Sequence, residues 1–253
     1  MSTKDDRRIV GEGTPESDWV AWPGLLEMPG IQVASLVSPG RRIVMVAPHP
    51  DDEIVGCAGL LMQLAALDHE LLIVGVTDGT GSHPGSRHWT PQRLAKTRPA
   101  ESLRALECLG LADVPILRLG LTDTRVTQER AELIRQLDDR LQPEDILVTT
   151  WRGDGHPDHE ATGQACAEIA AGKGCPLIEL PVWTWHWASP GDPRVPWERA
   201  RRVELSLDQY ERKRVALDAH VSQLTADDST GQDPVLAPFA LARMLRPFEV
   251  LFL

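Results

Sequence analysis

The chain has 253 residues, 42% hydrophobic and 25% charged, a balance typical of a globular protein rather than a disordered or collagen-like one. Its formal net charge of −11 argues against a general nucleic-acid binder, whose surface must neutralise phosphates. No apolar run is long enough to span a membrane, and the N-terminus lacks the apolar core of a secretory signal. The four cysteines have no CxxC spacing, so we expect a cytoplasmic protein without a disulfide framework.

The predicted elements follow a mixed N-terminal segment. Residues 1–40 contain several prolines together with Trp19 and Trp22, and we expect this segment to be an extension that packs on the rest of the chain. Continuous β-branched runs predict buried strands, and amphipathic or small-residue segments predict helices. The predicted strands are 43–47, 71–77, 114–119, 146–151, 177–183, 203–207 and 250–253, and the predicted helices are 54–67, 91–109, 127–141, 158–171 and 209–221.

Strands and helices alternate from residue 43 to about residue 185, which is the signature of βαβ units. We therefore predict an α/β protein, a Rossmann-like three-layer sandwich with a mostly parallel central sheet, as a single domain over 41–253. Ligands of such sheets bind beyond the carboxyl ends of the strands. The loops after the strands are therefore where functional residues are expected.

The loop after the first predicted strand carries one histidine and three acids, namely His49, Asp51, Asp52 and Glu53. An aspartate at a helix start can be an N-cap, but that explains only one of these side chains. Glu53 could cap the helix or support His49 from behind. The crowding of ionisable groups at the end of a buried strand indicates a functional loop.

The loop after the fourth predicted strand contains a second cluster, with His156, Asp158 and His159 following Asp154. A parallel sheet can bring this loop beside the first one. A histidine and an aspartate from one loop with a histidine from the other form a set that suits zinc, with an open position for water. A remaining acid could then act as a base. Asp154 could order the loop or contact a substrate.

These motifs, PHPDDE at 48–53 and HPDHE at 156–160, resemble those of the LmbE-like deacetylases, also called the PIG-L or N-acetylglucosaminyl-phosphatidylinositol deacetylase family. Enzymes of mycothiol and bacillithiol biosynthesis belong to this family. The resemblance covers about residues 41–225, including the turn at 77–81, Arg98 with Glu101, and the segment from Lys213 to Gln223. The first 40 residues and the segment 183–197 have no evident counterpart.

The resemblance implies a zinc-dependent amidase that removes acetyl from an N-acetylated amino sugar, with one Zn²⁺ per chain. By motif, three residues would hold the metal: His49, Asp52 and His159. Asp51 would be the general base. His156 would assist the oxyanion and the leaving amine, and Asp158 would pair with His156 and raise its pKa. This division suits amide hydrolysis, which needs an activated water, a stabilised oxyanion and a proton for nitrogen.

Five further residues are candidates for substrate binding, each with a structural alternative. Aspartates that end strand–loop units could bind sugar hydroxyls, an arginine could clamp a phosphate or hydroxyl, and tryptophan could stack on a sugar. A histidine at the end of the last predicted helix could line the site or simply belong to the core. These residues are Asp78, Arg98, Asp123, Trp185 and His220.

Other functions remain as alternatives. The same site could serve a non-sugar amide or a thiol conjugate, and a metal site without turnover would make a binding module. A dinucleotide-binding protein would need a glycine-rich turn after the first strand, where this chain has acids. We expect a small-molecule amino-sugar conjugate as the partner, with no nucleic acid and no membrane span. A monomer and a homo-oligomer both stay open.

Overall fold

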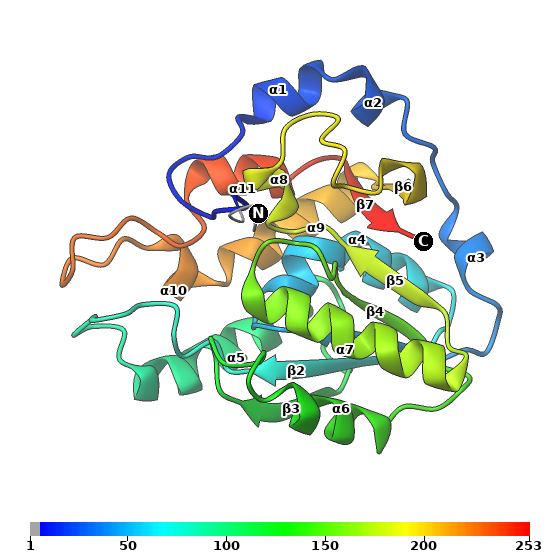
Figure 1. Ribbon diagram of the computed structural model, residues 1–253, viewed down its shortest axis with the longest axis horizontal. Coiled ribbons are helices and arrows are strands. Elements are labelled where there is room, and N and C mark those ends of the chain that lie inside the picture. Colours follow the sequence, from blue (N-terminus) through cyan, green and yellow to red (C-terminus); the bar gives the residue numbers. More distant parts are fainter. Residues whose placement is uncertain (1–5) are drawn as a thin grey trace, which may run out of the picture.

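Seven strands form one sheet in the order β3-β2-β1-β4-β5-β7-β6 in the computed structural model, which describes residues 6–253 (Figure 1). The first five strands pair in parallel, and β7 is antiparallel to both β5 and β6. The predicted mostly parallel α/β fold is confirmed. The strands are β1 (Ile43–Ala47), β2 (Leu71–Thr77), β3 (Ile116–Leu121), β4 (Ile146–Thr150), β5 (Leu177–Leu180), β6 (Ala200–Glu204) and β7 (Phe248–Phe252).

Helices cover both faces of the sheet, and the alternation of side chains along β1 shows why. Met45 points into one core with helices α4 (Asp52–Ala66), α5 (Pro91–Cys108) and α9 (Leu207–Asp218). Its neighbours Val44 and Val46 point into a second core with α6 (Arg130–Asp138) and α7 (Pro157–Lys173). A strand buried on both faces must be apolar throughout, as IVMVA is.

The N-terminal segment lies across the β6–β7 end of the sheet (Figure 1). It contains three short helices: α1 (Glu16–Ala21), α2 (Pro23–Leu26) and α3 (Val33–Leu36). Trp19 is 0% exposed and donates a hydrogen bond of 3.0 Å from its indole to the carbonyl of Trp185. The Arg246 guanidinium pairs with Glu16 at 2.6 Å. These contacts fit an extension that packs on the body, although the division at residue 40 stays a prediction.

Most of the predicted elements are present, with ends displaced by a few residues. The expected strand 177–183 ends at Leu180, and the residues after it turn into a short helix, α8 (Thr184–Trp187). The other unpredicted short elements are α10 (Val221–Leu224), α11 (Pro238–Met244) and a 3₁₀ turn at Trp197–Arg199. Helices of one or two turns have too few residues to show a period, and packing rather than propensity stabilises them. Within residues 6–253, no helix has the length and apolarity required to cross a membrane.

Candidate functional site

The candidate site lies where the direction of the sheet's connections changes. β1 leads into α4 on one face, and its neighbour β4 leads into α7 on the other face. The loops that follow these two strands therefore separate and leave a crevice above the carboxyl ends, which is where open α/β sheets bind ligands. The first loop carries His49 and Asp51, and the second carries Asp154 and His156.

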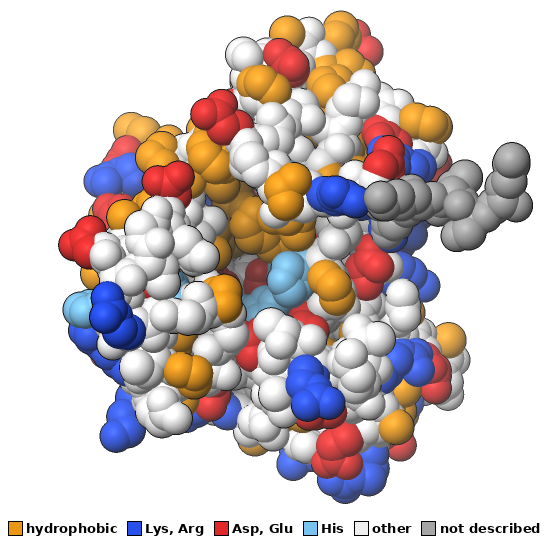
Figure 2. All heavy atoms as spheres, turned by 60° about the vertical axis from the view of Figure 1, so that its left-hand side comes forward, with side chains coloured by type: hydrophobic (Ala, Val, Ile, Leu, Met, Phe, Trp, Pro, Cys, Tyr) orange, Lys and Arg blue, Asp and Glu red, His pale blue; other side chains and the backbone are white. Residues whose placement is uncertain are grey.

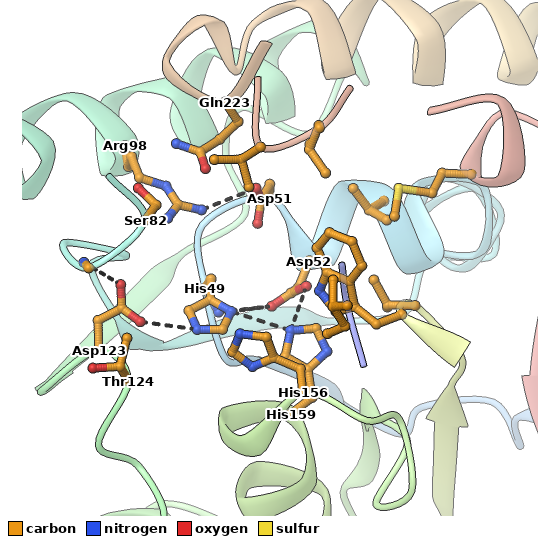
Figure 3. Close-up of a pocket in the computed structure, with 18 residues that line it drawn as sticks. His49, Asp51, Asp52, Ser82, Arg98, Asp123, Thr124, His156, His159 and Gln223 are labelled. Atoms are coloured by element: carbon orange, nitrogen blue, oxygen red, sulfur yellow. Dashed lines mark hydrogen bonds and ion pairs between the residues drawn. The ribbon is translucent and has the colours of Figure 1, made fainter. Parts of the chain in front are cut away.

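Two imidazole nitrogens and the two oxygens of one carboxylate converge at the base of this crevice (Figure 3). His49 Nδ1 lies 3.3 Å from Asp52 Oδ2, and His159 Nε2 lies 3.3 Å from Asp52 Oδ1. The two imidazole nitrogens are also 3.3 Å apart. A tetrahedral zinc ion with ligands at about 2.0–2.1 Å separates them by about 3.4 Å. These spacings would suit one tetrahedral metal ion held by His49, Asp52 and His159.

Each imidazole is oriented by a carboxylate on its other nitrogen, as is common for metal-binding histidines. His159 Nδ1 lies 2.8 Å from Asp154 Oδ2. His49 Nε2 lies 3.3 Å from Asp123 and 3.4 Å from Asp158. Asp154 is itself fixed, because it accepts hydrogen bonds from the backbone of Val182, Trp183 and Thr184. Asp154 thus orders the loop and supports His159.

The charges around these ligands favour a cation. Burial lowers the pKa of His159, but Asp52 and Asp154 raise it to about 9 overall. Burial also lowers the pKa of His49, yet hydrogen bonds to Asp123, Asp158 and Asp52 raise it well above its ordinary value. The pKa of Asp52 is raised by burial but lowered more by His159 and His49, so it lies well below the usual range. The acids that raise the pKa values of these two rings would also attract a divalent cation.

Asp51 has a different environment from the ligands. Its backbone is in the left-handed region, with φ of 130°, a conformation that costs free energy and is often found at functional sites. Burial raises the pKa of its carboxyl to about 7, although the charge of Arg98 opposes this shift. Glu53 accepts a hydrogen bond of 3.2 Å from the Asp51 backbone N–H, so Glu53 supports Asp51 rather than His49.

Arg98 lines the pocket but is committed to the chain itself. It is 3% exposed, and its guanidinium donates to the carbonyls of Gly79 and Pro50 and to Asp51 Oδ2 at 3.1 Å. A side chain at Gly79 would lie 2.0 Å from this guanidinium, on a backbone with φ of +63°. These contacts hold the loop at Pro50 and Asp51, and the expected clamp on a phosphate or hydroxyl stays a prediction.

His156 is the N-cap of α7, directly before Pro157. Its Nδ1 accepts a hydrogen bond of 3.3 Å from the Asp158 backbone N–H. The ring centroid is 4.8 Å from that of His159 and 5.0 Å from that of His49, and one nitrogen of each of the three rings lies within a common 4.8 Å. Burial and the charges of the other two histidines lower the pKa of His156 to about 2.

The expected pairing of Asp158 with His156 is corrected by the structure. The Asp158 carboxylate accepts from the backbone of Thr124 at 2.7 Å and Val126 at 3.2 Å, and it faces His49. It does not raise the pKa of His156, because its two oxygens are engaged elsewhere. Asp158, Asp123 and His49 instead form a second cluster whose ligand atoms lie within 4.8 Å of one another.

Three of the five expected substrate residues lie outside the pocket that contains His49, Asp52 and His159. Asp78 pairs with Arg118 and lines a separate cavity beside β2. Trp185 is 5% exposed and packs against Trp19, because residues 184–187 are helical and do not alternate as a strand would. His220 is 0% exposed in the core, and burial lowers its pKa to about 3. Asp123 and Arg98 do line the pocket.

The pocket has a volume of about 400 Å³ and two kinds of wall. Figure 2 shows its mouth, with histidine at the base and hydrophobic side chains on one side. Sequence reasoning missed most of these walls, because they come from distant segments with no motif; Gln223 stands in the segment quoted for the resemblance. The missed lining residues are Ile9, Val55, Thr124, Val182, Gln223, Val235, Leu236 and Met244, and the lining also includes Gly81, Ser82 and Trp183.

Comparison with known proteins agrees with the motifs. The sequence model of the PIG-L family, described as GlcNAc-PI de-N-acetylase, matches residues 44–170. The chain is 30% identical over 192 residues to a probable N-acetyl-alpha-D-glucosaminyl L-malate deacetylase 2 of Bacillus anthracis, covering 72% of this chain and 81% of the relative. It is 27% identical over 139 residues to diacetylchitobiose deacetylase of Thermococcus kodakarensis, covering 54% of this chain and 51% of the relative.

A solved structure shares the fold. N,N'-diacetylchitobiose deacetylase from Pyrococcus horikoshii superposes with a TM-score of 0.58 at 21% identity, covering 78% of this chain and 76% of that chain. At this identity the likeness concerns the fold, and it matches a mixed sheet with helices on both faces.

Proposed function

Because the chain belongs to the PIG-L family of de-N-acetylases, we propose that it is a metal-dependent hydrolase that removes the N-acyl group from an N-acetylated amino-sugar conjugate. One observation carries this proposal: two imidazole nitrogens lie 3.3 Å apart, and each lies 3.3 Å from a different oxygen of Asp52, beside a further buried acid, Asp51. The relatives named above are deacetylases, hydrolases that cleave amide bonds.

The residues that would hold the metal are His49, Asp52 and His159. Two imidazoles and one carboxylate with an open position are a donor set that suits zinc, and we propose one Zn²⁺ per chain. When bound, such an ion lowers the pKa of a water molecule and polarises the amide carbonyl.

Asp51 would accept the proton of the attacking water. A general base works best with a pKa near the working pH, and the pKa of Asp51 is about 7. Arg98 holds the carboxylate through Oδ2, so Oδ1 is free of that contact and can take the proton. The same proton can then pass from Asp51 to the leaving nitrogen.

His156 would stabilise the developing charge on the carbonyl oxygen. Because its Nδ1 accepts a backbone N–H, the proton of the neutral ring is on Nε2. With its lowered pKa, the ring is neutral at pH 7. We therefore propose that His156 donates a hydrogen bond from Nε2, rather than acting as the imidazolium expected from the resemblance.

The experiment is an acetate-release assay of zinc-supplied protein across a panel of N-acetylated amino sugars and simple non-sugar acetamides. The proposal expects release from the sugars, with a kcat/KM well above that for the acetamides. Equal or faster release from the non-sugar amides would overturn the sugar specificity. No release from any compound by zinc-loaded protein would overturn the activity.

A further inference from the structure

The lining of the pocket divides into an apolar wall and a polar wall, which meet where the Leu236 backbone N–H donates to the Gln223 carbonyl at 2.9 Å. Resting on the proposed function, we propose that the site accepts, in preference to acetyl, an uncharged aliphatic acyl chain longer than acetyl, bound against the apolar wall, while the sugar lies against the polar wall. The apolar wall consists of Ile9, Val55, Val182, Trp183, Val235, Leu236 and Met244, and the polar wall consists of Gly81, Ser82, Arg98, Asp123, Thr124 and Gln223.

The order of strands along the sheet separates the two walls. Ser82 follows β2, Asp123 and Thr124 follow β3, and Arg98 is on α5. The polar wall thus lies on the β2–β3 side of the metal ligands, which follow β1 and β4. In Figure 3, Ser82, Arg98, Asp123 and Thr124 lie together on one side of His49.

The apolar wall comes from the opposite side of the sheet. Val182 and Trp183 follow β5, and Met244 ends α11, the helix that precedes β7. A side chain at Gly56, next to Val55, would contact Leu180 of β5 and Val182. The segment that carries Ile9 is tied to α8, because the carbonyl of Val10 faces the His186 imidazole at 3.2 Å.

The chemistry of an N-acyl amino sugar fits this division. The sugar and the acyl chain are on opposite sides of the scissile C–N bond, which must lie at the metal ligands between the walls. The polar wall offers a hydroxyl at Ser82, a carboxylate at Asp123 and an amide at Gln223, which suit sugar hydroxyls. The acyl chain is then directed over the β5–β7 side.

An acetyl methyl group would leave most of the apolar wall exposed to water. Burial of each further methylene against such a wall favours binding by about fourfold. The chain must also be uncharged, because among the described lining residues Arg98 is the one Lys or Arg, and its guanidinium binds Gly79, Pro50 and Asp51. A charged acyl terminus would have no counter-ion on the apolar wall.

The test compares N-acetyl-, N-butanoyl- and N-hexanoylglucosamine as substrates of the zinc-loaded enzyme. We expect kcat/KM to rise about fourfold per methylene, on the order of 10²-fold from acetyl to hexanoyl. In the Asp51→Asn variant, the Kd measured by titration calorimetry should fall in the same order without turnover. Highest kcat/KM and tightest binding for N-acetylglucosamine would overturn the inference and leave the proposed function intact. Hydrolysis of none of the three would overturn both.

Three variants test which wall binds the acyl chain and which binds the sugar. Val235→Thr keeps the shape of a half-buried lining side chain and adds a hydroxyl, so the hexanoyl-to-acetyl ratio of kcat/KM should fall several-fold. Val215→Thr makes the same change on the exposed surface of α9 and should leave the ratio unchanged. Ser82→Ala should lower kcat/KM for both substrates without altering the ratio. If Ser82→Ala changes the hexanoyl-to-acetyl ratio of kcat/KM and Val235→Thr does not, the acyl chain binds on the polar wall. That result would overturn the inference.

Discussion

Asp51 and Asp52 are neighbours in the chain, yet their carboxyls have opposite surroundings. Asp52 lies between two imidazoles that lower its pKa well below the usual range, as a metal ligand requires. The pKa of Asp51 is raised by burial to about 7, as a base near neutral pH requires. Environments that push the pKa values of adjacent acids apart are a common way to assign their roles.

Asp51→Asn should separate proton transfer from metal binding. Asparagine has the shape of aspartate but cannot accept the proton of water. We expect near-normal zinc content and a kcat lower by about 10²–10⁴-fold. Metal analysis and steady-state kinetics on the same preparation measure both. Loss of zinc in this variant would show that Asp51, rather than Asp52, is the ligand.

Arg98→Gln should shift the acid limb of the pH profile. The base must be ionised, so kcat/KM falls as the pH drops through the pKa of Asp51. The positive charge of Arg98 lowers that pKa, so its removal should raise the pKa and move the limb to higher pH. Arg98→Lys keeps the charge and should move the limb less. An unshifted limb in Arg98→Gln would mean that Asp51 is not the group that titrates.

At the scale of elements, the start of α7 shows what could be predicted from sequence. The helix predicted from residue 158 begins one residue earlier, at Pro157, since proline suits the first helical position, and His156 lies before it while His159 lies on its first turn. The partners of these residues were not predictable, because they depend on how far-apart loops meet. The backbone N–H groups of Thr124 and Val126 donate hydrogen bonds to the Asp158 carboxylate. No local sequence pattern predicts these hydrogen bonds.

Asp154→Asn should weaken metal binding although Asp154 is not itself one of the proposed metal ligands. Asp154 orients His159 and accepts three backbone N–H groups of residues 182–184, and an amide replaces one accepting oxygen by a donor. We expect a zinc affinity about 10–100-fold lower, as for other partners of metal-binding histidines. Competition with a chelator measures it. The matched control is Asp78→Asn, whose carboxylate pairs with Arg118 outside the site; equal zinc affinities in both variants would contradict this role.

At the scale of the molecule, the periodicity of hydrophobic residues was sufficient to predict most strands of the sheet and the two functional loops that follow β1 and β4. Strands β1 and β2 lie where the apolar runs place them, because strands buried on both faces have few alternatives. The apolar wall, by contrast, joins Ile9, Val182 and Met244, which no sequence pattern connects. The position of Trp185 was not predictable for the same reason: it packs with Trp19 of the distant N-terminal segment and does not line the site.

Trp19→Ala should test how firmly the N-terminal segment is bound to the body. Trp19 is fully buried against Trp185 and Trp197. Removing a buried aromatic side chain costs about 3–5 kcal/mol of the free energy of unfolding, measured by urea denaturation. Val20→Ala, next to it but exposed, should change the free energy by less than about 0.5 kcal/mol. Similar small effects in both variants would mean that the segment adds little to the fold.

Zinc binding is the measurement that tests the central claim most directly. Titration calorimetry of metal-free protein in buffers of different ionisation enthalpy gives the stoichiometry, the affinity and the protons released. Zinc needs the ligating nitrogens of both imidazoles unprotonated, and the pKa values of His49 and His159 are raised, so one zinc ion per chain should bind tightly and release protons as it binds. His49→Ala, Asp52→Ala and His159→Ala should each lose this binding. Tight binding that survives all three substitutions, or no tight binding by the unmodified protein, would contradict the assignment of this site as a metal-dependent hydrolytic centre.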